Sequence, residues 1–225
     1  MNIAAVEKFS LLDYPNKISA IVFTQGCNYD CFYCHNRSLI EFKENKNYNS
    51  TLSFLEKRKN QLEAVVISGG EPTMQLALKS FIGEVKNLGY LVKLDTNGSN
   101  PLILKELIDN KLLDYVALDV KAVWANYKSI CSKGANWEKV NSSLQILKET
   151  FDDWEVRTTI YPNLSINNLE VIKRQIGKVP LWRLNVYREP SDYKNENQVK
   201  IKGRYLNKEE LEKWALSTKT KVTIN

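Results

Sequence analysis

Six short apolar runs alternate along the chain with segments that have the periodicity of amphipathic helices. The runs are rich in β-branched residues, so we expect a buried strand at each of them and a helix after each of the first five. Strands that alternate with helices indicate a parallel sheet with right-handed crossovers, and six units are too few for a closed eight-stranded barrel. The sequence therefore predicts an α/β fold, an open, partial (βα)6 barrel of the TIM type. The expected strands are 18–24, 64–68, 91–95, 115–120, 156–161 and 182–187, and the expected helices are 51–62, 74–88, 101–113, 136–150 and 165–176.

The size and composition favour one soluble domain over residues 1–225. Its core is expected over about 9–190, followed by a tail at 199–225 with a helix at 208–217 and a possible strand at 221–224. No apolar run is long enough for a signal peptide or a membrane span. Four cysteines, three of them clustered, do not suggest disulfides, which indicates a reduced, cytoplasmic protein. The net charge of +6 is scattered and forms no basic stripe, so we expect neither a nucleic-acid nor a membrane partner.

Three of the four cysteines follow the first expected strand at C-x3-C-x2-C spacing, as Cys27, Cys31 and Cys34. Clustered thiolates select zinc, copper(I) or an iron–sulfur cluster. Structural zinc usually takes four ligands in two separated pairs, and no second pair exists in this sequence. Three cysteines on a 4Fe-4S cluster would leave one iron without a protein ligand, and that iron could bind a substrate.

Polar strings follow three further expected strands at the point where each strand ends. They are 68–73 (Ser-Gly-Gly-Glu-Pro-Thr), 95–98 (Asp-Thr-Asn-Gly) and 119–121 (Asp-Val-Lys). Active sites of parallel βα folds collect at the carboxyl ends of the strands, so we expect these strings and the cysteines to meet at one rim. Two carboxylates there, Asp95 and Asp119, would require a cation or a proton between them.

The cysteine spacing, the aromatic Tyr33 before the last cysteine and these strings together resemble the radical S-adenosylmethionine (SAM) enzymes. From about Phe9 to Tyr187 the chain is most similar to the activases of glycyl-radical enzymes, and among those to the activating proteins of anaerobic ribonucleoside-triphosphate reductase. The resemblance implies reductive cleavage of SAM at a 4Fe-4S cluster to a 5′-deoxyadenosyl radical, which removes hydrogen from a glycine of a partner glycyl-radical enzyme. It also implies a flavodoxin- or ferredoxin-like electron donor.

The same resemblance implies roles for individual residues. Cys27, Cys31 and Cys34 would hold the cluster. Glu71 would bind the amino group of SAM, and Lys121 would pair with its carboxylate. The full set implied to bind SAM is Tyr33, Gly69, Gly70, Glu71, Thr96, Asn97, Lys121 and Arg157, and a monovalent cation is implied at Asp95, Thr96 and Asp119.

Two alternatives follow from the same residues. The first is a radical SAM enzyme that acts on a small molecule, similar to 7-carboxy-7-deazaguanine synthase, and the second is a zinc-stabilised binding module. The sixth expected strand departs from the activases, because it has Asn185-Val186-Tyr187-Arg188 where they have glutamine and phenylalanine before the arginine. The fourth cysteine, Cys131, is expected to be a small buried hydrophobe, and His35 is expected to shape the cysteine loop.

Overall fold

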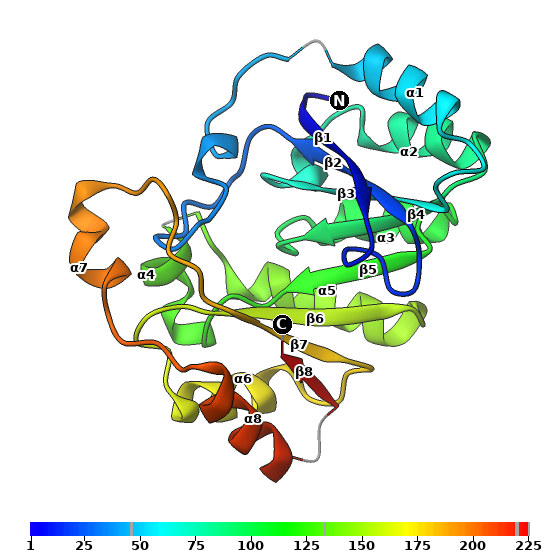
Figure 1. The fold of residues 1–225 in the computed structure, drawn as a ribbon. Helices are drawn as coiled ribbons and strands as arrows, with labels where there is room; N and C mark the ends of the chain where they lie inside the picture. The colour runs from blue at the N-terminus through cyan, green and yellow to red at the C-terminus, as the bar shows by residue number, and fades with distance from the viewer. Residues whose placement is uncertain (46, 133, 219–220, 225) are drawn as a thin grey trace.

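The computed structural model describes residues 1–45, 47–132, 134–218 and 221–224. They form one curved sheet of eight strands in chain order, and the main helices lie on its outer side (Figure 1). β2 to β8 run parallel, and β1 is antiparallel to β2. The predicted α/β class and open barrel are confirmed.

The strands are β1 (Ile3–Ser10), β2 (Ser19–Thr24), β3 (Ala64–Gly69), β4 (Leu91–Thr96), β5 (Tyr115–Asp119), β6 (Trp154–Ile160), β7 (Trp182–Val186) and β8 (Val222–Ile224). The helices are α1 (Tyr48–Lys57), α2 (Leu78–Asn87), α3 (Pro101–Asp109), α4 (Tyr127–Cys131), α5 (Trp137–Thr150), α6 (Ile166–Ile176), α7 (Gln198–Ile201) and α8 (Lys208–Ser217).

The sequence did not predict β1. This strand lies at the edge of the sheet, and of its residues only Ile3 is buried. Glu7 and Lys8 interrupt its apolar residues, so no apolar run marks it in the sequence. The strand is instead defined by its backbone pairing with β2, which runs from Ile3 opposite Thr24 to Ser10 opposite Ser19.

The helix expected at 74–88 is shorter in the structure. A 3-10 turn covers Pro72–Met74, Gln75 is extended, and α2 begins only at Leu78. Gln75 leaves the helical conformation because its side chain bridges other elements. Its amide donates to the carbonyl of Gln25 at 2.8 Å and accepts from the backbone N–H of Asn2 at 2.9 Å. The helix expected at 165–176 is confirmed, with Ser165 as the N-cap of α6 in a reciprocal capping box.

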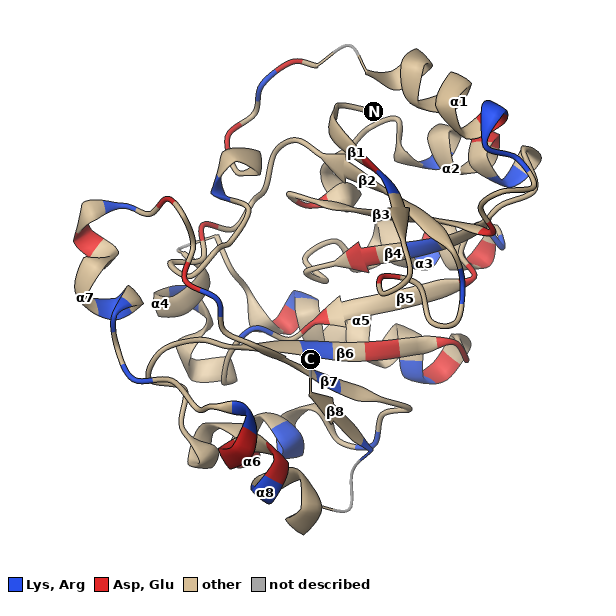
Figure 2. Cartoon of the chain, viewed as in Figure 1, with Lys and Arg blue, Asp and Glu red and all other residues tan. Residues whose placement is uncertain are grey.

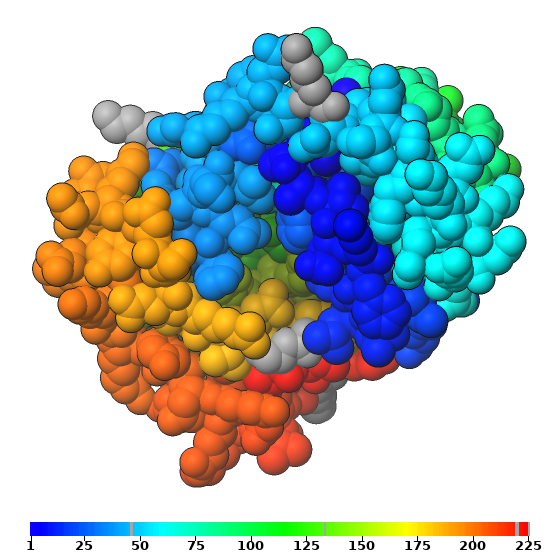
Figure 3. Space-filling view, turned by 45° about the horizontal axis from the view of Figure 1, so that its top comes forward, coloured from blue at the N-terminus to red at the C-terminus, as the bar shows by residue number. Residues whose placement is uncertain are grey.

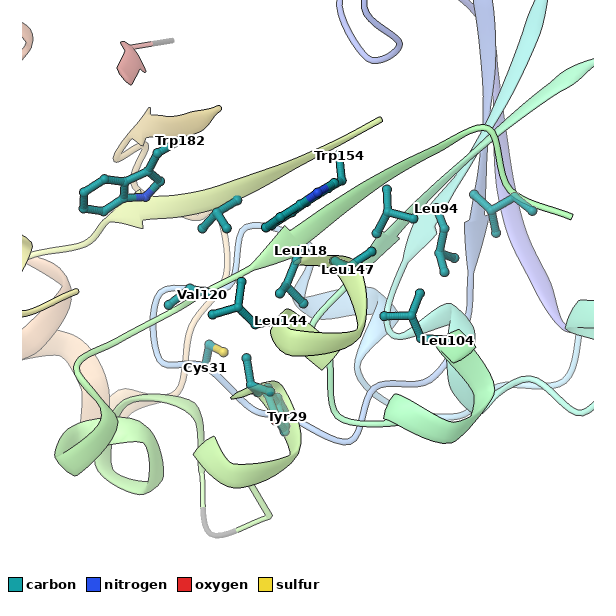
Figure 4. Close-up of a cluster of buried hydrophobic side chains, with 14 of the residues drawn as sticks. Tyr29, Cys31, Leu94, Leu104, Leu118, Val120, Leu144, Leu147, Trp154 and Trp182 are labelled. Atoms are coloured by element: carbon teal, nitrogen blue, oxygen red, sulfur yellow. The ribbon is translucent and has the colours of Figure 1, made fainter. Parts of the chain in front are cut away.

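The two faces of the sheet differ in chemistry. On the outer face, Leu94 and Leu118 are fully buried beside Leu104 of α3 and Leu144 of α5 (Figure 4). The inner face of β2 and β3 is also apolar, but in β4 to β7 it is charged, and blue and red bands follow one another along β4 and β6 (Figure 2). The charged residues are Lys93, Asp95, Asp119, Glu155, Arg157 and Arg183.

No helix in the described part of the chain combines the length and the apolarity needed to cross a lipid bilayer.

Replacement of Trp182 by alanine should lower the free energy of unfolding by about 3–5 kcal/mol, because it empties a fully buried site. The indole Nε1 of Trp182 also donates to Thr158 Oγ1 at 3.0 Å, and its ring meets that of Trp214 edge-on. Urea unfolding measures the loss. Trp124 is the matched control, since it is 59% exposed and its replacement should cost less than about 1 kcal/mol. Equal losses at the two positions would contradict this packing.

Candidate active site at the carboxyl ends of the strands

A cavity of about 450 Å³ opens at the carboxyl ends of the parallel strands. In the space-filling view it is a hollow ringed by the dark-blue N-terminal segment, the light-blue segment after the cysteines and the orange segment after β7 (Figure 3). Its size suits a small-molecule ligand. All the residues that the sequence analysis names for the cluster, for SAM and for a cation line this one cavity.

The cysteine loop is fixed from two sides by backbone hydrogen bonds. The N–H of Cys27 donates to the carbonyl of Ile40 at 3.0 Å, and the N–H of Asp30 donates to the carbonyl of Cys131 at 3.1 Å. The carboxylate of Asp30 also pairs with Arg37 at 2.8 Å. The three cysteines are therefore held on a braced loop, and the end of α4 is part of the brace.

The four thiols are free and largely shielded from water. Burial raises the pKa of Cys27 to about 12 and also raises that of Cys34. A hydrogen bond with the Cys131 thiol, followed by burial, raises the pKa of Cys31. Without metal the thiols of Cys27, Cys31 and Cys34 are therefore protonated at neutral pH, and metal binding would have to displace their protons. Cys31 lies where the hydrophobic core meets the cavity, near Tyr29 and Leu144 (Figure 4).

The three loop cysteines are ligands of the kind that an iron–sulfur cluster takes. Structural zinc usually takes four protein ligands, whereas Cys27, Cys31 and Cys34 bring three thiolates to the cavity. The donor set therefore fits a 4Fe-4S cluster.

Gly69, the last residue of β3, and Gly70 after it let this part of the chain pack directly on the end of β2 and the loop that follows β2. A Cβ on Gly70 would lie 2.0 Å from the carbonyl oxygen of Gly26, and one on Gly69 would lie 2.3 Å from the backbone nitrogen of Thr24. Gly69 also has a φ of +116°, which favours glycine. The resemblance implies contact of both glycines with SAM. They do line the cavity, but their close contacts are with protein backbone.

Glu71 is buried and bonded to four protein donors. Its Oε1 accepts from the N–H and the hydroxyl of Thr73 and, at 2.7 Å, from the hydroxyl of Thr96. Its Oε2 accepts from the N–H of Asn97 at 2.7 Å. Burial raises the pKa of Glu71 although these hydrogen bonds oppose the shift. Each carboxylate oxygen has about two lone-pair positions, and among the described residues Oε2 accepts only from Asn97, so it can accept one further donor.

Asn97 connects the loop after β4 to the cysteine loop. Its Nδ2 donates to Oδ1 of Asn28 at 2.9 Å, and its Oδ1 accepts from the N–H of Ser99 at 2.9 Å. Asn28 in turn donates to the hydroxyl of Ser99 at 2.8 Å. The amide expected to contact SAM is thus used mainly to position the loop that carries Cys27 and Cys31.

Arg157 lies between the two aspartates at the strand ends. Its Nη1 donates to Asp95 Oδ2 and its Nε to Asp119 Oδ1, both at 3.0 Å. Lys121 Nζ donates to the other oxygen of Asp119 at 3.0 Å. Burial alone would raise the pKa of Asp119, but these two cations outweigh it and bring that pKa to about 2. Burial would lower the pKa of Lys121, yet Asp119 and nearby thiols raise it, so the ammonium stays charged.

Tyr33 forms an aromatic wall of the cavity. Its ring stacks on Tyr161 at 4.9 Å with an interplanar angle of 12°, and Phe32 packs edge-on against both. The Tyr33 hydroxyl is buried without a hydrogen-bond partner in the described structure. An unsatisfied buried hydroxyl on a cavity wall is suited to a polar ligand.

Sequence reasoning missed part of the cavity lining. The end of β7 and the residues just after it, where the chain departs from the activases, line the cavity with Asn185 and Val186 of the strand and with Tyr187 and Arg188. Thr159 of β6 lines it too. Thr159 pairs in register with Asn185. The position of these residues at the ends of expected strands was the signal that could have identified them. His35 is exposed and also lines the cavity.

Comparison with known proteins identifies relatives over most of the chain. The family model described as the radical SAM superfamily matches residues 21–176. Two proteins of Methanocaldococcus jannaschii, provisionally named glycyl-radical enzyme activating enzymes, are 35% and 29% identical to the chain. The first match covers 88% of this chain and 85% of the relative, and the second covers 79% and 70%.

Solved structures share the fold at low sequence identity. Streptococcus suis SuiB bound to S-adenosylmethionine has a TM-score of 0.68 at 14% identity, over 89% of this chain and 48% of that one. TYW1 with a lysine-pyruvate adduct bound has a TM-score of 0.62 at 19% identity, over 88% of this chain and 72% of that one.

Gly70→Ala should disrupt the packing of the two loops and with it the cysteine site, because the added methyl group would overlap the Gly26 carbonyl. We expect a lower unfolding midpoint and a clear loss of iron bound after anaerobic reconstitution. Gly83→Ala is the control, since a Cβ there meets nothing within 4 Å and alanine favours a helix by about 1 kcal/mol. Full iron content in Gly70→Ala would contradict the close loop contact.

Asp119→Asn should lower the free energy of unfolding by about 2 kcal/mol at neutral pH. The native pKa of Asp119, about 2, lies below the usual value of about 4, so its contribution is complete above pH 4 and is lost as the pH falls toward 2. The difference between wild type and variant should therefore shrink below pH 4, which urea unfolding from pH 7 to pH 3 would measure. Asp109→Asn removes an exposed pair with Lys105 and should cost less than about 1 kcal/mol throughout.

Proposed function

The chain belongs to the radical SAM superfamily, which uses a 4Fe-4S cluster and SAM, and from this premise we propose that it activates a glycyl-radical enzyme. The observation that carries the proposal is the meeting of the three loop cysteines with the strings after β3, β4 and β5 in one cavity. The names and coverage of the two archaeal relatives support the activase assignment.

The residues present fit both cofactors. Cys27, Cys31 and Cys34 would hold the cluster. Lys121, which stays charged beside Asp119, suits the carboxylate of SAM, and the remaining acceptor position of Glu71 suits its amino group. Bound together, the cluster and SAM supply one-electron cleavage of a carbon–sulfur bond and hence hydrogen abstraction from carbon.

The protein's own contribution is position, charge and exclusion of water. The hydrogen bonds of Glu71 and Asn97 fix the loops after β3 and β4 relative to each other and to the cysteine loop. Tyr33 and Tyr161 close one wall with aromatic surface. A ligand in this cavity would therefore find its polar partners already ordered.

The finer assignments rest on resemblance. We propose anaerobic ribonucleoside-triphosphate reductase as the partner, a flavodoxin- or ferredoxin-like protein as the electron donor and the cytoplasm as the compartment. The hollow between the N-terminal segment and the segment after β7 would have to admit the glycine-bearing loop of the partner (Figure 3). A radical SAM enzyme for a small molecule is the alternative, and its turnover would depend on that small molecule.

Anaerobic reconstitution with iron and sulfide, followed by dithionite and SAM, should yield 5′-deoxyadenosine from the wild type and none from Cys31→Ala. Removal of one ligand leaves too few thiolates for the cluster. Cys131→Ala is the control, because it removes the one cysteine outside the motif and should retain the iron. If the protein bound zinc in place of iron and formed no product, the activase proposal would be wrong and a zinc-stabilised binding module would remain as the alternative.

Addition of candidate partners then tests the activase assignment. Anaerobic ribonucleoside-triphosphate reductase should gain a glycyl-radical EPR signal in amounts that follow SAM consumption. If only another glycyl-radical enzyme gained the signal, the chain would still be an activase, but that enzyme would be its partner. SAM cleavage without a signal from any such enzyme would favour the small-molecule alternative.

A further inference from the structure

We infer that the Arg157 guanidinium is the built-in counter-ion of Asp95 and Asp119, so that the site works without a monovalent cation. The resemblance implied such a cation at Asp95, Thr96 and Asp119, and the described contacts do not fit it. Two carboxylates this close require positive charge between them. The structure supplies that charge from the chain itself.

All four carboxylate oxygens of the two aspartates face a cationic nitrogen. Arg157 reaches one oxygen of each aspartate at 3.0 Å. Lys121 lies 3.0 Å from the second oxygen of Asp119, and Lys93 lies 3.3 Å from the second oxygen of Asp95. A metal ion would have to compete with hydrogen bonds at three of these oxygens. Asp95 Oδ1 accepts no hydrogen bond in the described structure, and there the ion would meet the charge of Lys93.

Thr96, the third expected ligand, is used elsewhere. Its hydroxyl donates to Glu71 Oε1 at 2.7 Å and accepts from the N–H of Gly98 at 3.1 Å. Alkali and alkaline-earth cations prefer several oxygen ligands around one centre. Two carboxylates bridged by a guanidinium and a hydroxyl turned to another carboxylate do not provide that arrangement.

Charge leads to the same conclusion. Four cationic side chains, counting Arg183, face three carboxylates, counting Glu155, so the group already carries a net positive charge in a partly shielded place. A further cation would be repelled, and the repulsion is strong where water is scarce. Removal of Arg157 would end this repulsion, because the two carboxylates would then face each other with an open space between them and would attract a cation.

The test uses the cluster-free, full-length protein under reducing conditions, so that it depends neither on SAM nor on a partner. Unfolding midpoints are compared in choline, sodium and potassium chloride at equal ionic strength. The wild type should have the same midpoint in all three salts. Arg157→Gln should have a lower midpoint in choline and recover about 2–4 °C in sodium or potassium, because the small cation binds the vacated space and stabilises the fold.

Two variants separate this role from general stabilisation. Arg157→Lys keeps the charge and should remain insensitive to the salt. Arg183→Gln breaks an arginine–carboxylate pair with Glu155 on the same face, but leaves Asp95 and Asp119 bridged, so it should lose stability equally in all three salts.

A rise of 2 °C or more for the wild type in sodium or potassium over choline would overturn the inference. So would an Arg157→Gln protein that folds and shows no cation rescue. If Arg157→Gln does not fold, the wild type and Arg157→Lys still test the inference. An unfolding midpoint that depends on the salt in either protein would contradict a built-in counter-ion. If the protein failed to cleave SAM, the proposed function would be wrong, but the outcome of this salt comparison would still stand.

Discussion

A row of alternating charges, buried at one end and half-buried at the other, holds the inner face of the sheet together. It runs from Glu155 through Lys93 to Asp95, and from there through Arg157 to Asp119 and Lys121. Burial of one such charge without its neighbours would cost several kcal/mol, so each member depends on the next. Because the members come from β4, β5 and β6 and from the segment just after β5, the row fixes these strand ends relative to one another.

The cavity owes its place to this division of the sheet. The outer face is apolar and packs under the helices, whereas the charged half of the inner face cannot be covered by apolar side chains at low cost. The loops at the carboxyl ends therefore close around polar groups. Glu71 accepts from the loop after β4, and Asn97 donates to Asn28 of the cysteine loop, so the row and the cysteines share one framework.

Much of this architecture could be predicted from the sequence. The β-branched runs identified the parallel strands, Ser165 identified the start of α6, and the ends of the strands identified the rim where the site residues meet. The missed strand β1 has exposed charges and is defined by its partner, β2. The contacts of Arg157 also could not be predicted, because its two aspartates lie 38 and 62 positions away and the strand register decides which side chains meet.

The free energy of unfolding alone does not explain why this half of the inner face is charged. A buried ion pair rarely stabilises a fold more than apolar side chains of the same volume would. β2 and β3 solve the same packing problem with Ile21, Ala64 and Val66. What the charges add is a wall on which an ammonium group, Lys121, stays ionised although burial opposes it. A wall of this kind can meet an anionic group without rearrangement, since its charges are already ordered by their neighbours.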